Sequence, residues 1–401
     1  MKLPPPYDLT PAASIALVGL VLALAPLAWW WLRHRDTEPV VRLHALSWAT
    51  LFLTFDLVLF GAFTRLTDSG LGCPDWPGCY GNASPLGASS EIGAAQSAIP
   101  SGAVTHDKAW VEMIHRYLAT AVGVLVLVLA VASWIDRLSS RRSNGVAWTA
   151  VQGLRAAPSP WWATATLIGV CLQGAFGALT VTMKLYPAVV TLHLLGGMAL
   201  LALLAAQSQS YARVALRLPE RLYVGMLLIA ALCVVQIALG GWVSTNYAVL
   251  ACRDFPTCQN SFWPEMDFEH GFSVLHELGV GKDGAFLPFA SLTAIHYVHR
   301  LMAMVALVAI ALLAWRLYVE GSVESRRWAI ALAGVALWQL ASGLSNVLLD
   351  WPMLAALAHT AGAAALVVVL TVLIARATHS RRRSVAVPVR GKRPHRLHSK
   401  R

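Results

Sequence analysis

Long apolar stretches separated by short polar segments make up most of this chain. Nine stretches are mostly apolar over about 20 residues or more, the length that a helix needs to cross the hydrocarbon core of a bilayer. They lie at about 12–32, 44–64, 112–134, 161–183, 187–207, 222–244, 290–315, 328–349 and 353–375. The pattern predicts an all-α fold and a polytopic membrane protein.

The first of these stretches could also be a signal peptide. However, Lys2 is the only basic residue before it, and Arg33, His34 and Arg35 follow it where a cleavage site would need small residues. We therefore expect residues 1–43 to form one extra N-terminal transmembrane helix, which stays in the membrane, and an inner loop.

Composition agrees with a membrane protein and excludes a soluble enzyme. Of the 401 residues, 57% are hydrophobic and 13% are charged, whereas a soluble domain has about 45–50% apolar and about 25% charged residues. The net charge of +11 is concentrated in residues 376–401, which hold ten Lys or Arg residues and no acid, so the other 375 residues carry only +1 (11 − 10). We expect a disordered basic tail that binds anionic membrane lipid, and no nucleic-acid partner.

The basic residues of the loops predict how the chain lies in the membrane. Inner loops of membrane proteins carry an excess of Lys and Arg. With the N-terminus outside, the inner loops hold 13 such residues even without the tail, and the outer segments hold six. This predicts an inner C-terminus and two long outer loops, at about 65–111 and 245–289.

Four of the six cysteines lie in these two outer loops. Cys73 and Cys79 enclose Pro-Asp-Trp-Pro-Gly, and Cys252 and Cys258 enclose Arg-Asp-Phe-Pro-Thr. An oxidising compartment favours a disulfide bond within each pair. A zinc site is the alternative, although zinc usually binds closer Cys pairs with further ligands nearby.

The two cysteine loops belong to an internal duplication. Both have the pattern Cys-x-Asp-x-Pro-x-Cys, 179 positions apart. A His-Arg pair then follows at 115–116 and at 299–300, and a Gln-x-x-x-Gly pattern follows at 173–177 and at 339–343. The order of these features is the same in both halves, so the chain contains a parallel repeat.

The repeat divides the chain into segments. We predict two pseudo-symmetric four-helix transmembrane bundles, at 44–207 and 208–375. The extra helix of 1–43 precedes them and the basic tail of 376–401 follows them.

Four histidines lie inside the predicted helices at matched positions near the outer ends. They are His115, His193, His299 and His359. A single membrane histidine could simply hydrogen-bond to a neighbouring helix, but ionisable groups inside a membrane are costly and often functional. Because two imidazoles that face each other across a bundle can ligate heme iron, the pattern predicts a bis-histidine heme site in each half.

Residues beside these histidines suit a flat macrocycle. Small residues would let it approach the backbone, at Gly196, Gly197, Ala361 and Gly362. Arg116 and Arg300 each follow a candidate ligand and could bind heme propionates. Alternatively, these two arginines extend toward the membrane surface.

The halves differ at one position that bears on the chemistry. Glu112 precedes His115 by three residues and lies on the same helix face, whereas the second half has His296 at this position. A carboxylate beside only one site suggests that the two sites have different tasks. His296 is also an alternative ligand to His299, although the repeat favours His299.

Asp56 is a further acid inside a predicted helix, where its burial would be costly. The repeat offset leads from it to Val235, so it has no counterpart. It could pair with a polar group of the extra helix or take part in a proton path.

The motifs together resemble the heme A synthase family. The resemblance rests on the run from Gly61 to Gly81, on the segment from Glu112 to Tyr117 and on the later histidines, and it extends over about 44–375. It implies eight helices in two halves, and oxidation of the C8 methyl group of heme O to the formyl group of heme A for cytochrome oxidase. The segment 12–32 and the long outer loops exceed the family's compact pattern.

This resemblance also implies roles for individual residues. His299 and His359 would hold a low-spin heme b cofactor, and His115 and His193 would flank the substrate heme O. Glu112 would be the catalytic carboxylate. Cys73 and Cys79 would form the redox-active or structural pair of the first loop.

The resemblance further implies a place in the cell and partners. The protein would be a multi-pass protein of the bacterial inner membrane, with the N-terminus and both long loops periplasmic and the C-terminus cytoplasmic. Heme O synthase and cytochrome oxidase assembly factors would be candidate partners besides membrane lipid. A homo-oligomer is a further option.

The expected activity is that of an oxidoreductase acting on a CH or CH2 group, by stepwise oxidation of a methyl group through hydroxymethyl to an aldehyde. Glu112 could stabilise positive charge at the methyl carbon or accept a proton. The alternative is a bis-histidine b-type membrane cytochrome for quinol-linked electron transfer. A transporter would explain the repeat but not the four histidines, and the presence of Glu112 in only one half favours the enzyme.

Overall fold

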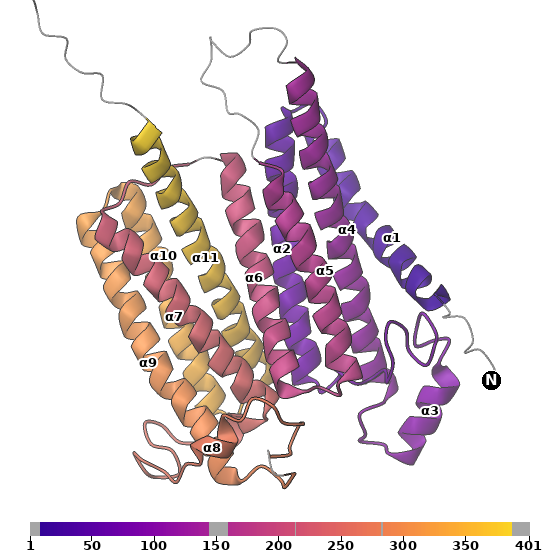
Figure 1. Cartoon of the computed structure of the whole chain (residues 1–401). Coiled ribbons are helices and arrows are strands. Elements are labelled where there is room, and N and C mark those ends of the chain that lie inside the picture. Colours follow the sequence, from indigo (N-terminus) through magenta and orange to yellow (C-terminus); the bar gives the residue numbers. More distant parts are fainter. Residues whose placement is uncertain (1–8, 144–158, 213, 282–283, 387–401) are drawn as a thin grey trace, which may run out of the picture.

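The described part of the chain is a set of long, roughly parallel helices joined by loops (Figure 1). The computed structural model describes residues 9–143, 159–212, 214–281 and 284–386. The long helices are α1 (Thr10–His34), α2 (Pro39–Leu66), α4 (His106–Ser143), α5 (Trp161–Thr182), α6 (Pro187–Ala212), α7 (Glu220–Thr245), α9 (Phe289–Glu320), α10 (Val323–Leu348) and α11 (Met353–Ala386). The loops contain the short helices α3 (Ser89–Ala98) and α8 (Phe268–Gly271) and the 3-10 turn η1 (Ala248–Leu250).

These helices confirm the predicted all-α membrane fold. Within the described residues, 9 helices are long and apolar enough to cross a membrane. Each predicted stretch coincides with one of them to within a residue or lies inside it. The first stretch is the 25-residue helix α1.

The helices pack in two groups that are related by the repeat. In the first group α2 packs against α4 and α6, and α5 packs against α4 and α6; in the second, α7 packs against α9 and α11, and α10 packs against the same two helices. The groups meet where α6 contacts α7 and α11 and where α2 contacts α11. Figure 1 shows α6 between the two groups and the loops that carry α3 and α8 at one end of the helices.

The extra helix α1 packs mainly on the outside of α4. Its Gly19 lies so close to α4 that a Cβ atom there would be 2.5 Å from Cγ2 of Thr120. Lipid tails are as apolar as leucine, so helices in a membrane gain their affinity from such close packing rather than from the hydrophobic effect. A glycine at this position therefore allows α1 to dock.

The helix α11 continues beyond the predicted span. It ends at Ala386, so residues 376–386 are helical and the prediction of a disordered tail from residue 376 is wrong for them. Arg376 bonds to Gln209 of α6 and Glu324 of α10, and Arg381 pairs with Glu220 of α7. These two cations serve contacts between helices, and residues 387–401, the rest of the predicted tail, lie outside the described residues.

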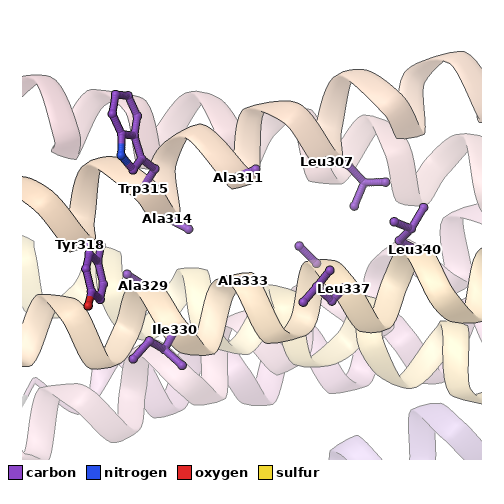
Figure 2. Close-up of a pocket in the computed structure, with 11 residues that line it drawn as sticks. Leu307, Ala311, Ala314, Trp315, Tyr318, Ala329, Ile330, Ala333, Leu337 and Leu340 are labelled. Atoms are coloured by element: carbon purple, nitrogen blue, oxygen red, sulfur yellow. The ribbon is translucent and has the colours of Figure 1, made fainter.

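An apolar groove of about 530 Å³ lies between α9 and α10 (Figure 2). Ala311, Ala314 and Ala333 leave space that Leu307, Trp315 and Leu337 border. The lining is almost wholly apolar and includes none of the candidate site residues.

Candidate functional site

The four histidines form two facing pairs, one in each group of helices. His115 on α4 and His193 on α6 lie close enough for their charges to interact, and so do His299 on α9 and His359 on α11. All four rings are half-buried. Each pair thus brings two imidazoles from opposite sides of a bundle to one place.

Each histidine ring fits into a notch that a glycine leaves on the preceding long helix. A Cβ on Gly61, Gly177, Gly240 or Gly343 would lie 3.1, 3.3, 3.0 or 3.3 Å, respectively, from the nearest ring atom of the histidine on the following helix. The same arrangement at all four positions shows that the repeat preserves ring placement. It also identifies His299, rather than His296, as the ring in the notch that faces His359.

Two of the small residues that were expected to leave room for a macrocycle pack against protein side chains instead. A Cβ on Gly196 would meet Oε1 of Gln173 at 2.2 Å, and one on Gly362 would meet Trp338 and Gln339. The expectation is therefore wrong for these two glycines, because neighbouring side chains fill the space beside them.

Two repeat-related glutamines fasten the backbone of the histidine helices. Gln173 donates from Nε2 to the carbonyl of His193 at 2.6 Å. Gln339, with its amide oriented to satisfy both ends, donates to the carbonyl of His359 at 3.1 Å. These bonds explain why the Gln-x-x-x-Gly pattern occurs in both halves.

In the second half, a polar side chain lies beside Nδ1 of each of the two histidines. The first half has no polar residue at the equivalent positions. Nε2 of Gln236 lies 3.1 Å from Nδ1 of His299, and Oγ of Ser342 lies 3.0 Å from Nδ1 of His359. In the first half, Nδ1 of His193 is buried without a partner. The sequence analysis did not single out Gln236 and Ser342. A comparison of the two halves could have found them, because the equivalent residues of the first half are the apolar Leu57 and Phe176.

Both predicted disulfide bonds are present in the outer loops. Cys73 is bonded to Cys79, and Cys252 is bonded to Cys258. The described part of the chain contains no group of three or more metal-ligating side chains, so the zinc alternative has no ligand set there.

An aspartate folds each of these loops in the same way. The carboxylate of Asp75 accepts hydrogen bonds from the backbone N–H groups of Tyr80 and Gly81, and Asp254 accepts them from Gln259 and Asn260. In each loop these two residues have positive φ, as in tight hairpin turns. The carboxylate stabilises the turn, which explains the aspartate in the repeated cysteine motif.

Arg116 and Arg300, which follow the candidate ligands in the sequence, each donate hydrogen bonds to backbone carbonyls of one disulfide loop. Nη1 of Arg116 donates to the carbonyls of Asp75 and Pro77, both at 3.0 Å. Nη1 of Arg300 donates to the carbonyls of Asp254 and Thr257, at 2.8 and 2.9 Å. Both arginines thus bond to carbonyls of the outer loops, and binding of heme propionates and extension toward the membrane surface both stay predictions.

Glu112 connects the first disulfide loop to the histidine helix. It is 4% exposed. Its Oε2 accepts a hydrogen bond from the backbone N–H of Cys73 at 2.7 Å, and its Oε1 pairs with Nη2 of Arg116 at 2.6 Å. A buried carboxylate thus lies one helical turn from His115 on α4, between the histidine pair and the loop.

The second half lacks this ion pair. His296 is 6% exposed at the equivalent position, and its Nδ1 has no partner. Arg300 bonds to carbonyl oxygens, and its Nε has no partner. Of the two repeat-related positions, only the one in the first half therefore places a carboxylate beside the histidine pair.

Asp56 does not join either site. It is exposed on α2, and no hydrogen bond or ion pair of its carboxylate occurs within the described residues. The expected pairing with a polar group of α1 is not observed, and a proton path through Asp56 stays a prediction.

Comparisons with known proteins agree with these features. A family model described as "Cytochrome oxidase assembly protein" matches residues 44–371 and so begins after α1. Heme A synthase of Shewanella oneidensis is 35% identical over 328 residues, which cover 81% of this chain and 93% of that protein. Heme A synthase of Methylobacterium sp. is 30% identical over 331 residues, 77% of this chain and 84% of the relative. That of Halalkalibacterium halodurans is 25% identical over 313 residues, 76% and 86% of the two chains.

Proposed function

Because the chain belongs to the heme A synthase family of cytochrome oxidase assembly proteins, we propose that it is an oxidoreductase that converts heme O to heme A. The reaction oxidises the C8 methyl group through a hydroxymethyl stage to a formyl group, so the enzyme acts on a CH or CH2 group. Neither a cytochrome that only transfers electrons nor a transporter is favoured, because the relatives are heme A synthases.

The two histidine pairs hold different hemes in this proposal. His115 and His193 flank the substrate heme O, and His299 and His359 hold a heme b cofactor. Facing imidazoles, the glycine notches and the buried, unpartnered Nδ1 of His193 fit bis-histidine heme binding. Bound between His299 and His359, heme b would supply electron transfer for the oxidation at the substrate site.

Glu112 is the group that distinguishes the substrate site. Loss of two electrons to the second heme and of one proton from the C8 methyl group would leave positive charge at that carbon, to which water adds with release of a second proton. A carboxylate held nearby stabilises this charge or accepts the proton that is released. Arg116 and the N–H of Cys73 fix the position of Glu112.

The observation that carries the proposal is the buried carboxylate of Glu112, which bonds to both Cys73 and Arg116 and occurs beside one histidine pair only. It is tested by the heme content of membranes that express the chain together with a source of heme O. Conversion predicts heme A in the extract. Unchanged heme O together with heme b would identify an electron-transfer cytochrome instead.

The proposal includes an orientation and partners. The N-terminus and the loops with the disulfides face the periplasm, and the C-terminus faces the cytoplasm, in agreement with the basic residues of the inner loops. Heme O synthase, which would deliver the substrate, and cytochrome oxidase assembly factors, which would take the product, are the proposed protein partners. Assembly into a homo-oligomer is part of the same proposal.

A further inference from the structure

We propose that Gln236 and Ser342 are positioning residues that make the second histidine pair a permanent heme site, and that their absence from the first half leaves that pair able to release its ligand. The inference rests on the proposed assignment of cofactor and substrate to the two halves. It explains how two halves with the same arrangement of helices and histidines could retain one heme and release the other.

The frame around the ligands is the same in both halves. Every ring lies in a glycine notch, and the backbone of His193 and of His359 is held by an equivalent glutamine. A difference in heme retention therefore has to come from residues that the repeat does not share. The ring Nδ1 atoms are where such residues occur.

Ser342 contacts the ring of His359. Its hydroxyl donates to the carbonyl of Trp338 at 2.7 Å, so its oxygen is left to accept a hydrogen bond from Nδ1 of His359 at 3.0 Å. With the Gln339 amide donating to the carbonyl of His359 and not to Nδ1, which lies 2.9 Å from it, Nδ1 would carry the proton and the lone pair of Nε2 would be free for iron. The same bond restrains rotation of the ring.

Gln236 restrains His299 at both its ring and its backbone. Nε2 of the amide lies 3.1 Å from Nδ1 and donates to the carbonyl of His299 at 3.2 Å. As placed, the Nε2 amide can only donate to Nδ1; rotation of the amide would bring Oε1, which has no partner here, to that position to accept from an Nδ1–H group. The glutamine thus holds the ring in place from α7, as the serine does from α10.

The first half has no equivalent restraint. The repeat offsets place Leu57 and Phe176 at the positions of Gln236 and Ser342, and neither side chain can form a hydrogen bond. Nδ1 of His193 is accordingly buried without a partner. At both positions, which lie on two separate helices, the residue is polar beside the proposed cofactor pair and apolar beside the proposed substrate pair.

Restraint of the ligand suits a cofactor and hinders a substrate. Loss of a hydrogen bond to a ligating histidine typically weakens metal binding about 10–100-fold. A cofactor that serves many turnovers benefits from that affinity, whereas a product that has to leave after each turnover would be delayed by it. The asymmetry therefore matches the two tasks.

The test uses the full-length purified chain with His193→Ala in every sample, so that low-spin bis-histidine heme arises at the second site alone. Q236L, which introduces the residue of the first half, and S342A are compared with S345A. Ser345 lies on the same helix and bonds to its own backbone at the carbonyl of Ala341, so its loss is a matched control. Transfer of heme to apomyoglobin gives the release rate, and a redox titration gives the midpoint potential.

We expect Q236L and S342A to release heme about 10-fold or more faster than S345A. Their midpoint potentials should be more positive, because an imidazole without a hydrogen bond at Nδ1 is a weaker donor to ferric iron. An unchanged release rate and potential in both variants would overturn the proposal. If Q236L does not fold, as judged by its helical circular dichroism, S342A decides the question.

This outcome is separate from that of the proposed function. Retention of low-spin heme at the second site is read without heme O and without turnover. A native chain that does not convert heme O would refute the proposed activity, while the release rates would still decide the role of Gln236 and Ser342.

Discussion

Arg65 donates a hydrogen bond from Nη2 to the backbone carbonyl of Ser244, at a distance of 2.6 Å. The two residues are 179 positions apart, which is the offset of the repeat, so Arg65 contacts the residue that occupies its own place in the other half. A residue can contact its own repeat equivalent only close to the pseudo-twofold axis that relates the two halves. The outer ends of α2 and α7 are that place.

A second pair follows the same rule. The hydroxyl of Tyr247 donates to Oδ1 of Asp68 at 2.7 Å, again across 179 positions. Arg65 pairs with Asp68 at 3.1 Å, and its guanidinium lies 4.1 Å from the centre of the Tyr247 ring. Three side chains thus join the two halves just before the disulfide loops begin.

We predict that R65Q loosens the contact between the halves. The side chain of Arg65 is 15% exposed, and its loss removes a charged hydrogen bond that typically contributes about 1.5–3 kcal/mol. R253Q is the control, because Arg253 forms an exposed pair with Asp350 that should contribute at most about 1 kcal/mol. Thermal unfolding in detergent measures both, and equal shifts of Tm would contradict the role of Arg65.

We predict that E112Q abolishes formation of heme A while heme binding is retained. A group that stabilises charge or accepts a proton typically contributes about 100-fold or more to the rate, and glutamine keeps the shape of the side chain without its charge. The measurement is heme A in extracted membranes, with the low-spin spectrum of the second site as a check on folding. E91Q, on the exposed helix α3, is the matched control and should convert heme O normally. A normal yield of heme A from E112Q would refute the assigned role.

We predict that G240A displaces the ring of His299. A Cβ atom there would lie 3.0 Å from Cε1 of the ring, and overpacking of this kind typically costs about 1–3 kcal/mol. G225A is an informative control, since Gly225 lies on the same helix and has no atom within 4 Å of the added Cβ. Only G240A should lower the content of low-spin heme in purified protein. Equal heme content in both variants would show that the notch does not position the ligand.

The second disulfide loop should lose stability in acid. The hydroxyl of Thr257, followed by the backbone N–H groups of Asn260 and Gln259, lowers the pKa of Asp254 below its usual value. Because the folded pKa is the lower one, the carboxylate stabilises the loop above the ordinary pKa of an aspartate, and this contribution disappears as the pH falls through the folded pKa.

D254N tests this dependence. The rate at which a phosphine reduces the bond between Cys252 and Cys258 is compared in the native chain and the variant at each pH, so that the pH dependence of the reagent cancels. The ratio of variant to native rate should fall toward one as the pH is lowered. A ratio that does not change with pH would exclude this role of the Asp254 charge.

The sequence by itself determined the helices and the pairing of the four histidines. Membrane spans need long apolar runs, and this requirement is local, so each predicted stretch matches one long helix, although helices such as α4 and α11 extend several residues beyond it. The repeat placed His115 with His193 and His299 with His359 because two like-built halves position equivalent residues alike. The cysteine spacing likewise predicted both disulfide bonds.

Only the tertiary structure decided what each polar group near the ligands does. Hydrogen bonds depend on which helices become neighbours, so the contact of Gln236 with His299 and the hold of Arg116 on the Cys73 loop cannot be read from spacing along one helix. The same holds for Arg65 and Ser244, which meet because the halves pack about a pseudo-twofold relation. Inside a membrane, where polar groups have few partners, these contacts between helices determine which equivalent positions differ in function.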